Sequence, residues 1–193
     1  MFERYRWMIV VPLLATLGAC SAVRPPRDPM GSLLPDVVGR GTGDRPVALP
    51  GACAGDAAIL LVGYSMASQF DLDQWLSGLH DRGIDVPVVE LPMAAIVRTR
   101  LASTPSADNT QSATPREDWA LVIRLTADDA TRLTRFLGTG NPVPARVVLI
   151  DAHGRVAFFH DGGYDIDALL DLSDVIDALN AEMLDTTALE PFE

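Results

Sequence analysis

Apolar residues occur along the chain either in continuous runs, typical of buried strands, or at every third or fourth position, typical of helices. The first change from one spacing to the other predicts a strand followed by a helix. Residues 58–64 (AILLVGY) form an unbroken apolar run, typical of a strand buried on both faces of a sheet. Ser68 and Asp71 then resemble a capping box, which predicts a helix with Ser68 as its N-cap and a stop at Gly83. The apolar face of this helix has the spacing i, i+3, i+4 and i+7: Leu72, Trp75, Leu76 and Leu79.

The middle of the chain continues the alternation of strands and helices. Strands are predicted at 85–92 and 119–125, and a helix from a capping box at Thr126 and Asp129 to a stop at Gly138. The strand–helix–strand order implies a parallel first pair with a right-handed crossover. Residues 103–115 contain no aliphatic residue larger than Ala and many turn formers, so we expect a flexible surface insertion there.

The C-terminal part predicts a hairpin and a final helix. Residues 145–150 and 155–160 are apolar runs joined by a tight turn, Asp151–Gly154, which makes an antiparallel pair. After Gly162 and Gly163, apolar residues return at helical spacing: Leu172, Val175, Ile176, Leu179 and Met183. The acidic residues between them are expected on a solvated face, and residues 184–193 as a polar tail.

The first twenty residues have the layout of a secretion signal. Two arginines precede an apolar run at 7–17, which is shorter than the roughly 20 residues that a membrane-spanning helix needs. The run ends in LGAC at 17–20, which resembles the bacterial lipobox, where the cysteine is acylated and becomes the mature N-terminus. The resemblance implies a signal peptide at 1–19, a lipid anchor on Cys20 and a domain in the bacterial cell envelope that faces the periplasm. Ser21 follows the cysteine, which by known sorting rules favours the outer membrane over the inner one. Residues 20–35, rich in proline and small residues, are expected to form a tether.

Charge and cysteine count exclude several functions. The 193 residues carry a formal charge of −11, and loss of residues 1–19, with two arginines and one glutamate, changes it to −12. So acidic a domain, without basic patches, is not expected to bind nucleic acid. Of the two cysteines, lipidation would use Cys20 and leave Cys53 without a partner in its own chain. An intramolecular disulfide and a thiolate metal site are therefore excluded, and no cofactor or metal is expected.

The predicted order of elements resembles the thioredoxin fold, in which helices flank a central mixed β-sheet. Residues 36–183 fit this order. Thioredoxin-like proteins place a Cys-x-x-Cys pair at the turn into the first helix. Aligned by the strand end, that pair falls on Gln69 and Leu72, and with a tighter turn on Ser65 and Ser68, so neither alignment offers a thiol. The superfamily's cis-proline before the hairpin is also in question, because counting back from Asp151 places Ala145 at its position.

A second resemblance concerns the segment GTGNPVPARVVLIDAHGRVAFF, residues 138–159. It is similar to mitochondrial ATP-synthase assembly factors and their bacterial relatives, on the basis of Asn141 before the strand and the turn from Asp151 to Arg155. This resemblance implies a non-catalytic, membrane-associated assembly role. Copper-delivery members of the superfamily combine two cysteines with a distant histidine, and this chain lacks the cysteines.

We therefore expect a redox-inactive, membrane-anchored module that binds an unidentified protein partner. Its binding residues are expected at the former active-site end, where the loop 64–70, the segment 141–144 and the turn 160–164 should lie together: Ser65, Met66, Ser68, Gln69, Asn141 and Pro144. The alternative is a one-cysteine thiol peroxidase or reductase that uses Cys53. His153 and His160 are interpreted as solvated or capping residues, so no catalytic residue is assigned.

Overall fold

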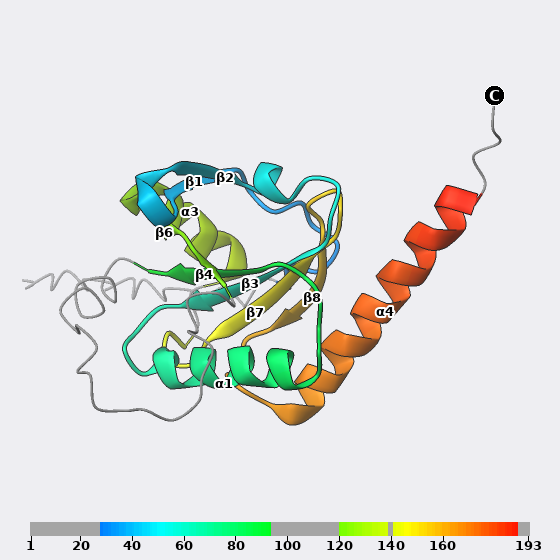
Figure 1. Ribbon diagram of the computed structural model, residues 1–193. Helices are drawn as coiled ribbons and strands as arrows, with labels where there is room; N and C mark the ends of the chain where they lie inside the picture. The colour runs from blue at the N-terminus through cyan, green and yellow to red at the C-terminus, as the bar shows by residue number, and fades with distance from the viewer. Residues whose placement is uncertain (1–27, 94–119, 139–140, 189–193) are drawn as a thin grey trace, which may run out of the picture.

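The computed structural model describes residues 28–93, 120–138 and 141–188 (Figure 1). Cys20, the rest of the predicted signal peptide and the expected insertion at 103–115 lie outside these ranges. None of the described helices is both long enough and apolar enough to cross a bilayer.

A five-stranded mixed sheet forms the centre of the molecule, with strand order β5-β4-β3-β7-β8. Its strands are β3 (Ala58–Gly63), β4 (Val88–Pro92), β5 (Leu121–Val122), β7 (Arg146–Ile150) and β8 (Val156–His160). The first pair, β3 and β4, is parallel, and β7 and β8 form the antiparallel hairpin, as the sequence predicts. Every residue of β3 is buried, which fits its unbroken apolar run and its central place.

Two layers cover the faces of this sheet (Figure 1). On one face lie α1 (Ser68–Asp81) and the first part of α4 (Ile166–Ala188), and the end of α4 extends away from the sheet. On the other face lie α3 (Ala127–Leu137) and a small sheet of order β2-β1-β6, made of β1 (Val37–Arg40), β2 (Pro46–Leu49) and β6 (Arg124–Leu125). Two short 3-10 helices, η1 (Thr42–Asp44) and η2 (Gly51–Cys53), flank β2.

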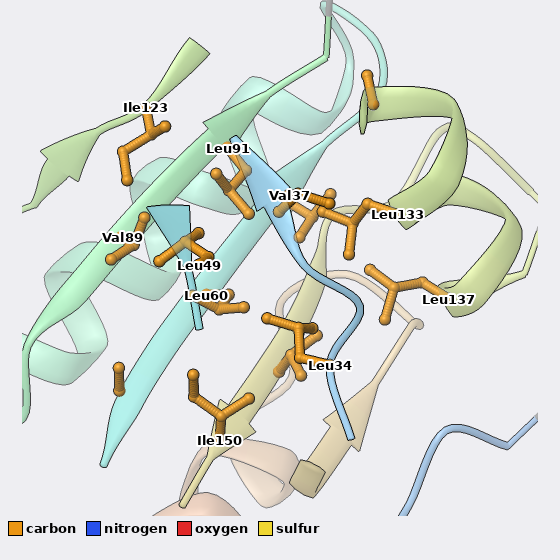
Figure 2. Packing of buried hydrophobic residues seen from close by; sticks show 14 of the residues in the cluster. Leu34, Val37, Leu49, Leu60, Val89, Leu91, Ile123, Leu133, Leu137 and Ile150 are labelled. Atoms are coloured by element: carbon orange, nitrogen blue, oxygen red, sulfur yellow. The ribbon is translucent and has the colours of Figure 1, made fainter. Parts of the chain in front are cut away.

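Each face of the central sheet has its own hydrophobic core. On the α3 side, leucines and valines from β1, β2, β4 and α3 meet over the sheet, as Figure 2 shows. On the other side, Trp75 and three leucines of α1 pack with Leu169 and Leu172 of α4. The predicted apolar face of α1 is therefore confirmed as core.

The helix α3 begins as predicted. Thr126 is its N-cap, and the Thr126 hydroxyl accepts a hydrogen bond from the Asp129 amide (3.2 Å). The same hydroxyl donates to the Asp129 carboxylate (2.8 Å). Gly138 ends the helix with a φ of +88°, a conformation that favours glycine.

The prediction of a single strand at 119–125 is wrong. These residues form two short strands, β5 and β6, which belong to different sheets. β5 pairs with β4 in the central sheet, whereas β6 pairs with β1 in the small sheet. Ile123 lies between them, fully buried, and its amide donates to the Glu90 carbonyl (2.9 Å). The antiparallel pair of β1 and β2, which the sequence analysis did not identify, supplies the second sheet.

Both predicted domain boundaries need correction. Leu34, assigned to the tether, is buried, and its amide donates to the Gly154 carbonyl (2.9 Å). The Gly31 amide donates to the Val156 carbonyl (2.8 Å), so the end of the expected tether pairs with the hairpin. At the other end, α4 continues to Ala188 within the expected polar tail. Folding onto the hairpin buries apolar surface that a free tether would expose.

Candidate functional site

Three segments that are distant in sequence meet at the end of the sheet where β3 stops and β7 starts, and we call this end the candidate site. Asp71, in the first turn of α1, joins them. Its carboxylate accepts a hydrogen bond from the Ala145 amide (3.0 Å). A Cβ atom on Gly163 would lie 2.8 Å from the same carboxylate, so only glycine fits there without movement. Asp71 and Ala145 directly follow the predicted loop 64–70 and the predicted segment 141–144, so their contact brings these two segments together with the turn 160–164.

The start of α1 corrects the role predicted for Ser68. Ala67, not Ser68, is the N-cap, and Asp71 bonds to Ala145 instead of to a cap. Ser65 and Ser68 form a reciprocal pair: the Ser68 amide donates to the Ser65 hydroxyl (3.3 Å), and the Ser65 amide donates to the Ser68 hydroxyl (3.0 Å). The Ser68 hydroxyl in turn donates to the Ser65 carbonyl (2.7 Å). The reciprocal bonds resemble a capping box, and they hold both hydroxyls in the turn.

The predicted binding residues divide into exposed and buried groups. Met66 and Asn141 are exposed, and Ser65 and Pro144 are half-buried. Ser68 is fully buried. The side-chain amide of Gln69 is buried without a hydrogen-bond partner among the described residues. Ser68 and Gln69 therefore shape the turn and cannot contact a partner through these polar groups unless the turn moves.

Large apolar side chains are exposed around the same turn. Met66 is 54% exposed, Phe70 67% and Val143 51%. Met66 lies in the turn before α1, and Phe70 lies in the first turn of that helix. The Asn141 side chain accepts a hydrogen bond from the Val143 amide (3.0 Å), which fixes the turn that presents Val143. The sequence analysis predicted the segments but not the contribution of Phe70 and Val143.

Trp75 of α1 holds the turn 160–164 in place. The fully buried indole donates from Nε1 to the Gly163 carbonyl (3.0 Å). Its ring makes an edge contact with Tyr164, with centroids 5.5 Å apart, and a tilted contact with His160 at 6.0 Å. His160 is therefore a packed residue rather than a solvated one. His153 is exposed in the hairpin turn, as expected.

A buried arginine, which the sequence analysis missed, lies beside the loop. Arg146 is only 2% exposed, and its guanidinium donates to the Tyr64 hydroxyl (2.9 Å) and the Gly138 carbonyl (2.6 Å). The guanidinium carbon is also 4.6 Å from the centroid of the Tyr64 ring. Burial raises the pKa of Tyr64, and Arg146 and a hydrogen bond with Thr134 lower it in part. These contacts join the end of β3 to β7 and α3.

The residue before β7, where the resemblance to thioredoxin-like proteins implies a cis-proline, is not a proline. Ala145 stands directly before β7, and its amide is needed for the bond to Asp71, a donor that proline lacks. Among the described residues the cis peptide bond is Leu49–Pro50, outside the 142–145 segment.

The chemistry available at the candidate site is limited. The hydrogen bonds described for the Ser65 and Ser68 hydroxyls join these two residues to each other, and none of these bonds involves a base. The described part of the chain contains no group of three His, Cys, Asp or Glu residues that could hold a metal ion. What the described residues of the site offer is exposed apolar side chains near a turn that is held by hydrogen bonds.

Cys53, the basis of the alternative function, lies at the opposite end of the sheet. It ends η2, where the neighbouring Gly55 amide donates to the Ala152 carbonyl in the hairpin turn (3.1 Å). The half-buried thiol has a raised pKa, mainly because burial disfavours the thiolate and also because Asp56 is nearby. A raised pKa is the reverse of what a reactive cysteine needs.

We expect the Cys53 thiol to react slowly with iodoacetamide at neutral pH, and its rate to keep rising above about pH 8.5, the pKa of a free cysteine. Mass spectrometry of the folded chain over a pH series measures this rate. Asp56→Asn should move the profile toward lower pH, and unfolded chain should react like free cysteine. A rate that levels off below pH 8.5 in the folded chain would restore Cys53 as a candidate nucleophile.

Comparison with solved structures shows that the chain has a thioredoxin-like fold. The thioredoxin domain of a thiol-disulfide oxidoreductase from Bacteroides vulgatus is 12% identical and superimposes with a TM-score of 0.55, covering 77% of this chain and 97% of that one. Yeast Sco1 with copper bound is 12% identical with a TM-score of 0.52 and coverages of 78% and 94%. BsSco, a member of the Sco family of cytochrome c oxidase assembly proteins, is 14% identical with a TM-score of 0.52 and coverages of 81% and 98%. No protein-family model and no curated protein sequence match the chain. At these identities the likeness shows the fold alone.

Proposed function

We propose that this thioredoxin-like domain is a redox-inactive protein-binding or assembly module, held in the bacterial cell envelope by a lipid on Cys20. One observation carries the proposal: at the turn into α1, where either alignment of the resemblance places a cysteine pair, this chain has no cysteine, and two bonded serines lie there beside exposed Met66 and Phe70. An apolar surface on a fixed turn is typical of a site that a partner covers. The assembly role also draws on the sequence resemblance around Asn141 and the hairpin turn.

The way the chain enters the domain supports a tethered binding module. Gly31 and Leu34 pair with Val156 and Gly154, at the hairpin end of β7, whereas the candidate site lies at the Arg146 end of that strand. An anchor attached through the preceding residues would thus pull on the end opposite to the site. Between Cys20 and Gly31, eleven residues reach at most about 36–40 Å when extended. The site would face away from the membrane surface and remain open to a partner.

We expect the mature protein from its native host to begin at Cys20, with acyl chains on that residue. The lipobox-like sequence and the short apolar run before it are the reasons. Mass spectrometry of the intact protein from membranes measures the N-terminal mass, and Cys20→Ser is the control that should leave the chain unprocessed. An unmodified Cys20, or one inside a longer mature chain, would contradict the proposed anchor.

The binding surface is tested by substitutions, of which Met66→Asp removes no described hydrogen bond, whereas Ser65→Arg and Asn141→Arg also remove bonds that hold their turns. Ser65→Arg, Met66→Asp and Asn141→Arg add charge or bulk at exposed or half-buried positions of the site, and each should reduce partner co-purification about tenfold or more. The matched controls Asp174→Lys and Asp177→Lys change exposed positions of α4 and should leave it unchanged. If the controls abolish co-purification and the site variants do not, the acidic helix is the interaction face and the proposed site is wrong.

A further inference from the structure

We propose that the folded domain also touches the membrane directly, through a turn at the chain entry that lies on a surface of anionic phospholipid. This turn, which we call the entry turn, comprises residues 28–34 and contacts Arg155 of the hairpin. The inference rests on the proposed lipid anchor and adds to it a second membrane contact, which belongs to the domain itself.

The entry turn presents two apolar side chains to solvent. Met30 is 46% exposed and Leu33 is 55% exposed, whereas the next residue, Leu34, is buried in the core. The Met30 amide donates a hydrogen bond to the Asp28 carboxylate (3.0 Å), which fixes the start of the turn. Apolar side chains that stand out from an ordered turn are suited to the boundary between lipid headgroups and acyl chains.

The rest of the backbone of the entry turn is held by the domain. The Ser32 amide donates to the Pro29 carbonyl (3.0 Å), and Gly31 has a φ of +72°, a conformation that favours glycine. The Gly31 amide donates to the Val156 carbonyl (2.8 Å), and the Gly31 carbonyl accepts from the Arg155 guanidinium (3.2 Å). The turn is therefore part of the folded domain, and a contact made by its side chains orients the whole domain.

The anchor keeps the entry turn close to the membrane surface. The eleven residues between Cys20 and Gly31 reach at most about 36–40 Å when extended, so the lipid holds the turn within that distance. Such a linkage gives the turn a high local concentration near the surface, and a contact too weak for a free protein can then persist. The candidate site, at the other end of β7, stays open to a partner.

The charge around the entry turn suits an anionic surface, although the whole chain carries −11. Residues 20–27 contain two arginines and no acid, and exposed Arg155 adds a third cation. Two acids of this region have roles in turns: Asp28 accepts from Met30, and Asp151 accepts from the amides of His153 (2.9 Å) and Arg155 (2.8 Å). Arginines next to an anchor are attracted to anionic lipid. The same surface repels the exposed acids of α4, which should tilt that helix away from it.

Two methionines provide a selective experiment, because they have similar exposure and lie at opposite ends of the domain: Met30 (46%) in the entry turn and Met66 (54%) at the candidate site. The acylated protein from host membranes is bound to the outside of vesicles of phosphatidylethanolamine and phosphatidylglycerol and treated with hydrogen peroxide. Mass spectrometry of peptides then gives the oxidation rate of each methionine. Met30 should react at least about threefold more slowly than Met66. Met93, only 7% exposed, should stay slow as long as the domain is folded.

Substitutions assign this protection to the entry turn. In Leu33→Asp, Met30 should react within about twofold of the Met66 rate, because an added carboxylate opposes contact with anionic lipid. The matched control is Leu170→Asp, at a leucine of α4 that is 40% exposed, and it should leave the protection unchanged. Arg155→Gln should weaken the protection without adding a charge, and so should vesicles of neutral phosphatidylcholine. Circular dichroism and the slow oxidation of Met93 check that each variant is folded.

The membrane contact is overturned if Met30 reacts as fast as Met66 on the anionic vesicles, or if Met66 is the protected methionine. It is also overturned if Leu33→Asp and Leu170→Asp lose the protection equally. The mass of the mature N-terminus separates this failure from failure of the anchor. An acylated Cys20 with an unprotected Met30 leaves the anchor in place and removes only the contact of the domain, whereas an unacylated Cys20 overturns both.

Partner co-purification separates the entry turn from the proposed binding function. Leu33→Asp should leave co-purification unchanged, because the entry turn and the candidate site lie at opposite ends of β7. Loss of the partner in this variant, with Leu170→Asp unaffected, would assign the turn to the protein partner and overturn its assignment to lipid.

Discussion

Replacing Trp75 with alanine is expected to lower the free energy of unfolding by about 4 kcal/mol, the cost of deleting a fully buried tryptophan. The change leaves a cavity between α1 and the sheet and removes the hydrogen bond to the Gly163 carbonyl. Urea unfolding followed by circular dichroism measures the loss. The turn 161–164 should also exchange its amide hydrogens faster, because the indole no longer holds it.

Trp75→Phe is the matched control for this prediction. Phenylalanine keeps much of the apolar volume but cannot donate to Gly163, so we expect a loss of about 2 kcal/mol, chiefly from the unpaired carbonyl. If the alanine variant loses less than about 1 kcal/mol, the indole is not packed as the structure shows.

Replacing Arg146 with alanine is expected to cost about 3 kcal/mol, because it leaves the Tyr64 hydroxyl and the Gly138 carbonyl without their charged donor. The pKa of Tyr64 should rise further in this variant, since burial already raises it and Arg146 lowers it in part. A tyrosine whose pKa is raised by folding stabilises the folded state below about pH 10, and that contribution is lost as the pH rises through the folded-state pKa. In the variant this loss is larger and extends to higher pH, because only the folded-state pKa of Tyr64 changes.

Carbon-13 NMR of labelled tyrosine follows Tyr64 separately from the two other tyrosines and measures the pKa directly. Arg146→Lys is the control: it keeps a positive charge, yet a single ammonium group lacks the planar fork that lets the guanidinium donate in two directions. An unchanged pKa for Tyr64 in Arg146→Ala would show that the two side chains do not interact in solution.

The elements that the sequence predicted well are those whose signal is local. Residues 58–64 and the face of α1 around Trp75 show their burial in their own spacing, and β3 and α1 lie where that spacing places them. The run around Ile123 looks like one strand for the same reason, but its two halves pair with different neighbours, β4 and β1. Which neighbour a short strand finds depends on the rest of the fold and not on its own apolar pattern.

The candidate site was predictable as a set of segments but not as a set of contacts. The sequence before α1 contains two overlapping patterns that could cap the helix, Ser65 with Ser68 and Ser68 with Asp71. The structure has the first pair, because Asp71 instead accepts a hydrogen bond from Ala145, which is 74 residues away in the chain. Arg146 begins an otherwise apolar strand, where a charged residue ordinarily points to solvent. Its burial depends on acceptors from β3 and α3, which the sequence of β7 does not reveal.

The position of the chain entry has a mechanical consequence for an anchored protein. Gly31 and Leu34 attach at the hairpin end of β7, and the candidate site lies at the other end of that strand. If a partner pulls on the site while the anchor holds the chain entry, the force runs along β7 and its neighbour β3. Hydrogen bonds between strands lie perpendicular to that direction, so the pull would shear them together instead of breaking them one after another. A domain pulled in this direction resists extension, because the force acts on all the hydrogen bonds between β3 and β7 at the same time.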